Sequence, residues 1–263
     1  MLTSLQNPLV KRMRSLHRAK GRREEGLFLL EGTHLLEAAL VANRAIVTVC
    51  FTPDWQTRYP DLAAQVMERA ERTEVVSPDV IRAIATTVEP DGVVAVLART
   101  STPAPMFTQL GLVLETIQDP GNLGTMIRTV AAVGADGVLL SADSVEIDNP
   151  KVLRASAGSW FQVPMTTSPD LAAELHHYQQ QGFQIIATLP TAEDSYWSVD
   201  LQKPTLLLLG NEGAGLSPDL AALADQAVKI PLSPGVESLN VAIAAALILY
   251  EAKRQRQEIG DGG

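Results

Sequence analysis

The sequence predicts an α/β protein whose larger part is a parallel β-sheet with helices on both faces. Short apolar runs with the length and composition of buried strands occur at residues 112–117, 137–140, 184–189, 204–209 and 228–232. Segments with helical periodicity separate these runs, and strand–helix alternation is typical of a parallel sheet. Glycine and polar residues follow several of the runs, where open α/β sheets bind ligands.

The first hundred residues form a smaller α/β segment. Strands are expected at residues 27–30, 46–52, 74–76 and 93–98, and helices at residues 33–41 and 61–70. Another helix is expected to begin at Ser77-Pro-Asp, with Ser77 as its cap and proline at its first position. Residues 100–106 then break the pattern, and their two prolines indicate a linker. We therefore place one domain at residues 1–99, a linker at 100–109 and a second domain at 110–263.

The second domain is expected to contain helices between its strands. They are predicted at residues 122–133, 151–161, 168–181, 216–224 and 238–256. The first of them should end at Gly134, because glycine adopts the left-handed conformation that closes a helix without strain.

Composition indicates an ordinary globular protein from a reducing compartment. The chain has 263 residues, of which 46% are hydrophobic and 19% charged, enough for two packed cores. It lacks the apolar segment of a signal peptide, and no apolar run reaches the roughly 18 residues of a membrane span. A cytoplasmic protein without membrane contact is expected. The single cysteine, Cys50, should be a small buried hydrophobe, and the histidines show no metal-ligand spacing, so no metal is expected.

Charge is unevenly distributed along the chain. The net charge of −9 argues against nucleic-acid binding when taken alone. Residues 1–23, however, contain seven basic residues and no acidic residue, so the rest of the chain carries −16. This segment is either a solvated, disordered arm or an arm that contacts RNA phosphates. It contains no phenylalanine or tyrosine to stack on bases, so it would contact phosphates and not read sequence.

The first polar cluster is Asp119-Pro-Gly-Asn122-Leu-Gly124-Thr-Met-Ile-Arg128, directly after the first strand of the second domain. Asn122 and Arg128 are six residues apart, which is not one face of a regular helix. Both can point into one crevice only if Asn122 caps the helix. A cap followed by a surface arginine is the simpler structural interpretation.

The second cluster is Gly210-Asn-Glu212-Gly-Ala-Gly215, in which glycines allow the backbone to approach a ligand closely. Its order differs from the Gly-x-Gly-x-x-Gly dinucleotide fingerprint, and no Gly-Lys-Thr phosphate loop occurs, which argues against a dehydrogenase or another nucleotide enzyme. A plain tight turn is the structural alternative, and the carboxylate of Glu212 weakens it.

The third cluster is Ile230-Pro-Leu-Ser-Pro-Gly-Val-Glu-Ser238-Leu-Asn240, between the last predicted strand and the last predicted helix. Ser238 is a plausible cap, so a purely structural role is an alternative here too. Asn240 would lie just inside the helix, where asparagine is a poor helix former and needs another reason to be present.

In this order, the three clusters resemble the signature motifs of the SpoU (TrmH-like) branch of the SPOUT RNA methyltransferases. The resemblance extends to Asn149-Pro-Lys151-Val-Leu-Arg154-Ala-Ser156-Ala-Gly158 and, in the first domain, to Asn7-Pro-Leu-Val-Lys, Phe28-Leu-Leu-Glu-Gly and Asp91-Gly-Val-Val-Ala-Val. It implies that the second domain is a SPOUT domain with a trefoil knot, a feature almost absent from other proteins. It also implies an L30e-like first domain that holds RNA, and a homodimer.

The resemblance implies methyl transfer from S-adenosylmethionine to a ribose 2′-hydroxyl of RNA. Ribosomal RNA, 23S in particular, is favoured over tRNA because the first domain resembles that of large-subunit enzymes. A tRNA methyltransferase and a non-catalytic RNA-binding or ribosome-assembly protein are the alternatives. The expected cofactor-binding residues are Leu209, Gly210, Asn211, Gly213, Ile230, Leu232, Ser238 and Leu239. The expected catalytic residues are Asn122, Arg128, Glu212, Ser238 and Asn240. The expected RNA-binding residues are Lys11, Arg12, Arg14, Arg18, Arg22, Arg23, Lys151 and Arg154.

The family assigns the role of base to the arginine that Arg128 matches, but a guanidinium does not normally lose its proton in a protein. An RNA phosphate could relay the proton, or Arg128 could orient the hydroxyl and stabilise the developing alkoxide. We favour the second role, with Asn122, Ser238 and Asn240 as orienting groups and Glu212 positioning Arg128.

Overall fold

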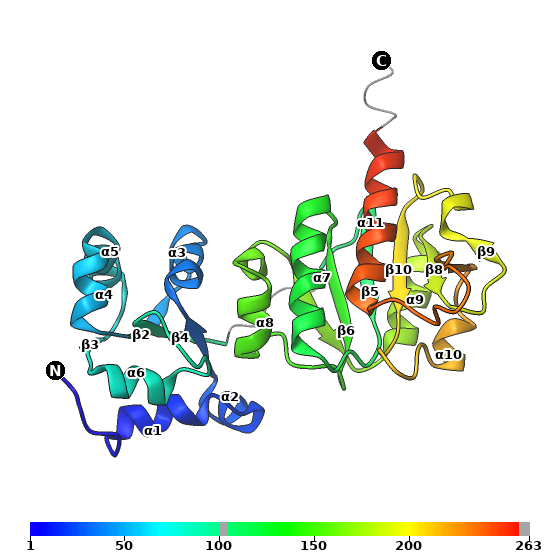
Figure 1. Cartoon of the computed structure of the whole chain (residues 1–263). Coiled ribbons are helices and arrows are strands. Elements are labelled where there is room, and N and C mark those ends of the chain that lie inside the picture. The colour runs from blue at the N-terminus through cyan, green and yellow to red at the C-terminus, as the bar shows by residue number, and fades with distance from the viewer. Residues whose placement is uncertain (100–104, 258–263) are drawn as a thin grey trace. The chain divides into compact units, whose positions relative to one another are not determined.

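The structure is a computed structural model that describes residues 1–99 and 105–257, and the chain divides into two compact units (Figure 1). Unit 1 comprises Met1–Ser101 with Glu146–Gln162, and unit 2 comprises Thr102–Val145 with Val163–Gly263. Residues 146–162, which the sequence analysis assigned to the second domain, thus group with the N-terminal residues. Residues 100–104 of the predicted linker lie outside the described residues, and Phe107, near its end, is buried in the core of unit 2.

Unit 1 contains a four-stranded mixed sheet in the order β1-β4-β2-β3. The strands are β1 (Leu27–Glu31), β2 (Ile46–Phe51), β3 (Thr73–Val75) and β4 (Val93–Ala98). Strand β4 pairs antiparallel with β1 and β2, whereas β3 joins β2 in parallel. All four strands lie within a residue of their predicted positions.

The helices of unit 1 are more numerous than the sequence analysis predicted. They are α1 (Pro8–Ser15), α2 (Ala19–Glu25), α3 (Thr33–Val41), α4 (Pro53–Arg58), α5 (Pro60–Arg69), α6 (Pro78–Ile84) and α8 (Pro150–Ala155). Helices α3, α5 and α6 were predicted, and the Ser77 side chain caps α6 by accepting from the Val80 N–H. Helices α1, α2 and α4 were missed. The predicted helix 151–161 is α8 followed by a 3₁₀ turn, Ser159–Phe161.

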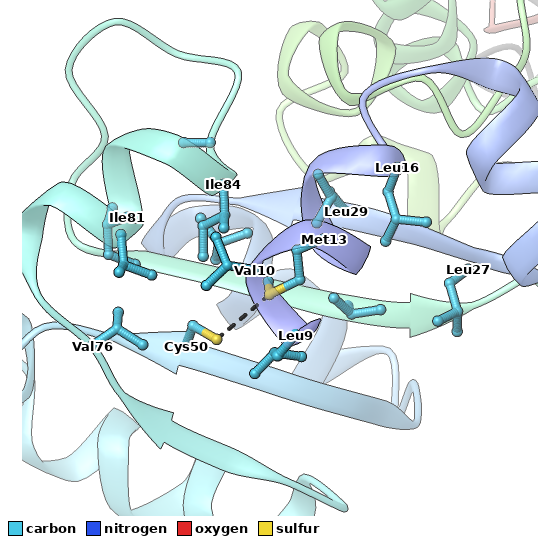
Figure 2. Packing of buried hydrophobic residues seen from close by; sticks show 14 residues of the cluster. Leu9, Val10, Met13, Leu16, Leu27, Leu29, Cys50, Val76, Ile81 and Ile84 are labelled. Carbon is cyan, nitrogen blue, oxygen red and sulfur yellow. Dashed lines mark hydrogen bonds between the residues drawn. The ribbon is translucent and has the colours of Figure 1, made fainter. Parts of the chain in front are cut away.

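The basic N-terminal segment is folded, so its interpretation as a solvated, disordered arm is wrong. Helix α1 begins with an Asn7 cap and a proline in its first turn, a strong start signal. Its apolar face places Leu9, Val10 and Met13 in the core of unit 1 (Figure 2). Cys50 is buried against this helix, with Sγ 3.6 Å from Met13 Sδ (Figure 2). Burial raises the pKa of Cys50 to about 12, as expected of a buried, unreactive thiol.

A buried ion cluster joins this N-terminal segment to residues 146–148. Arg22 is 2% exposed, and its guanidinium donates to Glu146 and to Asp148, where Nε lies 3.2 Å from Oδ1. Arg99 forms a second ion pair with Asp148. Burial raises the pKa of Asp148 more than the two arginines lower it, which shows how far this carboxyl is removed from water.

We expect Arg22→Met to lower the free energy of unfolding by roughly 3–5 kcal/mol, because it removes the buried counter-charge that Asp148 and Glu146 share. Urea unfolding monitored by circular dichroism measures the change. Lys20→Met is the matched control, since the Lys20 side chain is 81% exposed and its ammonium lies 3.7 Å from Glu24. A surface pair of this kind contributes little. Equal, small effects of both substitutions would contradict a structural role of the buried cluster.

Unit 2 is built on a seven-stranded sheet in the order β7-β6-β5-β10-β8-β11-β9, and every pairing is parallel. The strands are β5 (Leu110–Leu114), β6 (Gly137–Ser141), β7 (Met165–Ser168), β8 (Gln184–Thr188), β9 (Asp194–Ser195), β10 (Thr205–Leu209) and β11 (Gln226–Lys229). The predicted α/β class with a parallel sheet is therefore confirmed. Strands β7 and β9 were missed, and β11 ends before Ile230 instead of continuing to residue 232.

Helices cover both faces of this sheet, as predicted. They are α7 (Pro120–Val133), α9 (Leu171–Gln180), α10 (Pro218–Ala221) and α11 (Val241–Gln257). Helices α9 and α10 pack on one face, against side chains that include Val113 of β5 and Leu208 of β10. Side chains alternate along a strand, so neighbours such as Leu112 and Leu207 face the other way. There α7 and α11 lie side by side (Figure 1).

The predicted boundaries of α9 and α10 need correction. Ser168 ends strand β7, and the side chain of Asp170 caps α9. Helix α10 is shorter than the predicted 216–224: it starts later because Ser217 caps it and Pro218 opens it, and it already ends at Ala221. Gly134 closes α7 at φ 76°, as predicted. Among residues 1–99 and 105–257, no helix has both the length and the apolar character needed to cross a membrane.

Candidate active site

The sheet of unit 2 brings the three polar clusters to one edge. Strands β6 and β7 extend the sheet to one side of β5, while β10, β8 and β11 extend it to the other, so the topology switches beside β5. Parallel strands end at a common edge, and ligands of open α/β sheets bind at such a switch. The first cluster follows β5, the second follows β10 and the third follows β11.

A cavity of about 360 Å³ opens at this edge, within the size range of small-molecule sites. It is lined by the ends of β8 and β10, by the glycine-rich loop after β10, and by residues that lead into α11. All eight residues predicted to bind a cofactor line it, namely Leu209, Gly210, Asn211, Gly213, Ile230, Leu232, Ser238 and Leu239. Thr188, Leu189 and Pro190 also line the cavity and were not predicted, although the end of a predicted strand at the same edge was a usable signal.

The glycine-rich loop is a closed turn whose backbone lines the cavity. Asn211 and Gly215 exchange two backbone hydrogen bonds, of 3.0 and 2.9 Å. The Asn211 Oδ1 atom accepts from the N–H groups of Gly213 and Ala214, each at 2.9 Å. A Cβ atom on Gly210 would lie 2.3 Å from backbone atoms of Gly215 and Leu216, so only glycine fits there. The tight-turn interpretation is therefore correct as geometry, and the turn also forms a wall of the cavity.

A strained residue anchors this loop to the end of β5. Asn211 Nδ2 donates to the Thr116 carbonyl oxygen at 2.8 Å. Thr116 has φ 54°, rare for a β-branched residue. Its N–H donates to Ser141 Oγ at 2.7 Å, and its hydroxyl donates to Asp143 at 2.8 Å. Hydrogen bonds from Ser141 and Thr116 lower the pKa of Asp143, which therefore stays ionised and holds this conformation. Strain of this kind is often stored at functional sites.

Three predicted catalytic residues form one hydrogen-bonded chain. Asn122 Nδ2 donates to Glu212 Oε1 at 3.0 Å, and Asn240 Nδ2 donates to Asn122 Oδ1 at 2.9 Å. Asn240 Oδ1 accepts from the N–H groups of Ala242 at 2.9 Å and Ile243 at 3.3 Å, so it also caps α11. The chain links the glycine-rich loop, the start of α7 and the start of α11.

The predicted helix caps are wrong at both α7 and α11. Asp119 caps α7, because its Oδ1 accepts from the N–H groups of Gly121 at 2.6 Å and Asn122 at 3.0 Å. Asn240, and not Ser238, caps α11. Asn122 instead lies in the first turn of α7, which leaves its side chain to Glu212 and Asn240. Ser238 is exposed on the loop that lines the cavity.

Arg128 lies on α7, and its side chain is exposed. Among the described residues, the hydrogen bonds of the Glu212 carboxylate come from Asn122, Asn211 and the N–H groups of Gln118 and Asp119, and none comes from Arg128. The expectation that Glu212 positions Arg128 is therefore wrong, and the residue that Glu212 positions is Asn122.

The environment of Glu212 keeps it ionised. Partial burial raises the pKa of the carboxyl, but the hydrogen bonds from Asn122 and from backbone N–H groups outweigh burial, and the pKa lies below its ordinary value. A lowered pKa means that the contacts of Glu212 are present above the ordinary glutamate value of 4.5 and are lost as the pH falls through the folded-state pKa.

We therefore expect Glu212 to cause no change in the ligand affinity of the cavity between pH 8 and about 5, because its carboxyl stays ionised over this range. The affinity should fall only below the ordinary glutamate range. Calorimetric titration across this range measures the effect. Glu212→Gln should give a weaker affinity that no longer has this acid limb. A wild-type affinity that already falls between pH 7 and 6 would contradict the lowered pKa.

The structure divides the predicted RNA-binding residues into two groups. Five of the residues from the N-terminal segment are exposed on unit 1, namely Lys11, Arg12, Arg14, Arg18 and Arg23. Arg22 is buried in the ion cluster, so its prediction as an RNA-binding residue is wrong. Arg154 donates to Glu31 at 2.9 Å and to Thr86 at 2.6 Å, which gives it a structural role in holding α8 beside β1. Lys151, on the same helix, is exposed.

No group of three or more histidine, cysteine, aspartate or glutamate side chains that could hold a metal occurs within residues 1–99 and 105–257. The polar atoms around the cavity are backbone, amide, hydroxyl and carboxylate groups, which suit an organic ligand.

Comparison with known proteins matches two family models to the chain. The SpoU rRNA Methylase family matches residues 109–250, and the MRM3-like substrate binding domain matches residues 7–95. An uncharacterised tRNA/rRNA methyltransferase of Synechocystis sp. is 48% identical over 257 residues, which cover 97% of this chain and 94% of that protein. The 23S rRNA (guanosine(2553)-2′-O)-methyltransferase RlmP of Bacillus subtilis is 32% identical over 252 residues, with 96% and 98% covered.

A solved structure gives the same result. The AdoMet-bound rRNA methyltransferase from Sinorhizobium meliloti has a TM-score of 0.85 and 33% identity to this chain, and the match covers 96% of this chain and 97% of that one. The likeness therefore spans both units. The resemblance seen in the sequence is confirmed: the chain belongs to the SpoU rRNA Methylase family.

Proposed function

We propose that this protein is an S-adenosylmethionine-dependent RNA methyltransferase that acts on a ribose 2′-hydroxyl, with 23S ribosomal RNA as its substrate. The observation that carries the proposal is the chain Glu212–Asn122–Asn240 beside the cavity. A protein that only bound RNA would not need a hydrogen-bonded polar chain that begins in the wall of a small-molecule cavity. The relative RlmP, a 23S rRNA 2′-O-methyltransferase by name, supports the choice of substrate.

The residues of the cavity fit S-adenosylmethionine. Leu209, Ile230, Leu232 and Leu239 offer apolar surface to a flat base, and the glycine-rich loop offers backbone groups at close range. Glu237 adds a carboxylate to the lining, which suits an ammonium group. When bound, the cofactor supplies an electrophilic methyl group, and the protein must bring the ribose oxygen to it.

We propose that the exposed guanidinium of Arg128 contacts the RNA. No ion pair neutralises it in the described part of the chain, so its charge is available to a developing alkoxide. Such a donor stabilises the developing alkoxide in the transition state without accepting the proton, which passes to solvent water. Asn122 and Asn240 would orient the ribose, and Glu212 would fix the side chain of Asn122 for that task.

An apolar stripe on α11 supports a homodimer. Ile243, Leu247 and Tyr250 are spaced to share one face and are 52%, 39% and 51% exposed. We propose that this stripe packs against a second copy, and that unit 2 carries the trefoil knot of the family. Light scattering coupled to size-exclusion chromatography tests the dimer, which Leu247→Glu should dissociate. The proposed RNA substrate implies a cytoplasmic location.

Transfer of a labelled methyl group tests the proposed function directly. Purified protein is incubated with methyl-labelled S-adenosylmethionine and with unmodified transcripts of 23S rRNA or tRNA, and the RNA is digested to nucleosides for mass spectrometry. We expect one 2′-O-methylated nucleoside from the 23S transcript. Label on a base, or on tRNA alone, would contradict the proposed reaction or the proposed substrate.

A further inference from the structure

One buried hydroxyl, at the carboxyl end of a strand in the unit 2 sheet, makes no hydrogen bond in the part of the chain that the structure describes. Thr188 is the last residue of β8, and it lines the cavity. Its Oγ1 atom is buried and has no hydrogen-bond partner within the described residues. Nearly all buried side-chain polar groups in folded proteins have a partner, so an orphaned hydroxyl in a ligand cavity needs an explanation.

Packing alone does not account for threonine at this position. A valine has the same shape and β-branching, and it would fill the strand without burying an unpaired oxygen. The neighbouring residue Ala187 is fully buried in the sheet, and the N–H of Leu189 donates to the Val228 carbonyl oxygen at 2.9 Å, so the backbone here is satisfied. Only the side-chain hydroxyl is left over, and the cavity is the space beside it.

The surroundings of the hydroxyl favour a neutral polar partner. Two leucines beside Thr188 line the cavity: Leu189 is the next residue along the chain, and Leu209 lies on the neighbouring strand β10. A charged carboxylate or ammonium brought to a buried site with one hydroxyl as its partner would lose its hydration without adequate compensation. A heteroatom on the edge of a purine ring is neutral, and a hydroxyl can donate to it or accept from it.

We propose that Thr188 Oγ1 hydrogen-bonds the purine edge of the adenosine moiety of the cofactor, which makes Thr188 a specificity-determining residue of the cavity. This inference rests on the proposed use of S-adenosylmethionine. In the ligand-bound protein the orphaned hydroxyl gains its partner, and the apolar walls hold the faces of the ring.

The test compares Thr188→Val and Thr188→Ser with the wild type. S-adenosylhomocysteine is titrated by calorimetry, and 5′-methylthioadenosine, which lacks the amino-acid end, is measured by competition. Thr188→Val should weaken both ligands by the same factor, about fivefold to tenfold. Thr188→Ser, which keeps the hydroxyl, should stay close to the wild type. The melting temperature of the free Thr188→Val protein should be unchanged or higher, because the substitution removes an unpaired buried group.

The outcomes separate the two levels of the proposal. Unchanged affinity of Thr188→Val for both ligands, as when a water molecule satisfies the hydroxyl, would overturn the role of Thr188 alone. A loss confined to S-adenosylhomocysteine would place the contact at the amino-acid end and would also overturn it. A wild-type protein that binds neither ligand would instead refute the proposed cofactor.

Discussion

Replacement of Arg128 by alanine is expected to reduce methyl transfer to RNA by at least about 100-fold, the loss typical of a donor that acts in the transition state. Arg128 is exposed on α7, whose first turn holds Asn122 beside Glu212, and it does not line the cavity. The affinity for S-adenosylhomocysteine should therefore stay within about twofold of the wild type. Single-turnover transfer and calorimetry measure the two effects separately.

Arg254→Ala is the matched control for Arg128→Ala. Its guanidinium lies near the end of α11 and is 55% exposed, with Glu251 as an ion-pair partner. We expect no more than a small change in transfer, because the exposed Arg254 pairs with Glu251 within its own helix and such pairs contribute little. Equal transfer by the wild type and Arg128→Ala would remove Arg128 from the reaction and would leave the cavity assignment untouched.

The substitution Gly210→Ala is expected to weaken cofactor binding by about 10- to 100-fold, which corresponds to roughly 1–3 kcal/mol of overpacking. The added Cβ would lie 2.3 Å from the carbonyl carbon and oxygen of Gly215 and from the Leu216 nitrogen, all of them backbone atoms. The turn must open to make room, and the two backbone hydrogen bonds between Asn211 and Gly215 would be strained or lost. Calorimetric titration with S-adenosylhomocysteine measures the loss.

Gly213→Ala adds the same methyl group three residues further along the same loop. The nearest atom to its Cβ would be Asn211 Oδ1 at 3.6 Å, which is an ordinary contact. The φ angle of Gly213 is one that alanine adopts without strain. We expect its cofactor affinity to remain within about threefold of the wild type. If both alanine substitutions weakened binding equally, the cause would be general loop flexibility and not the close approach at Gly210.

Most of the sheet could be predicted because buried parallel strands leave a strong local pattern. The run Thr205–Leu209 contains four consecutive leucines, and it becomes the strand beside β5. The short edge strands β7 and β9 were missed, because partly polar strands of two to four residues resemble loops. In unit 1, charge concealed α1: the apolar spacing of Leu9, Val10 and Met13 was present but was read as part of a basic arm.

The site could be predicted to the level of the cavity but not to the level of individual contacts. The three clusters were placed correctly because each follows a strand of one parallel sheet. The partner of Glu212 could not be predicted, since its contact with Asn122 joins residues 90 positions apart. The residue that caps α7 could not be predicted either. Asp119 and Asn122 are both good cap residues, and only the path of the turn decides between them. Thr188 belongs to none of the motifs.

The most direct test of the proposed function is a map of 2′-O-methylated nucleotides in RNA from a strain that lacks the gene. We expect one ribose methylation of 23S rRNA to disappear, to return when the wild-type gene is restored, and to remain absent when the restored gene encodes Arg128→Ala. A strain that keeps every 23S rRNA ribose methylation and loses one in tRNA would contradict the proposed substrate. Recovery of the modification by the Arg128→Ala protein would contradict the proposed active site.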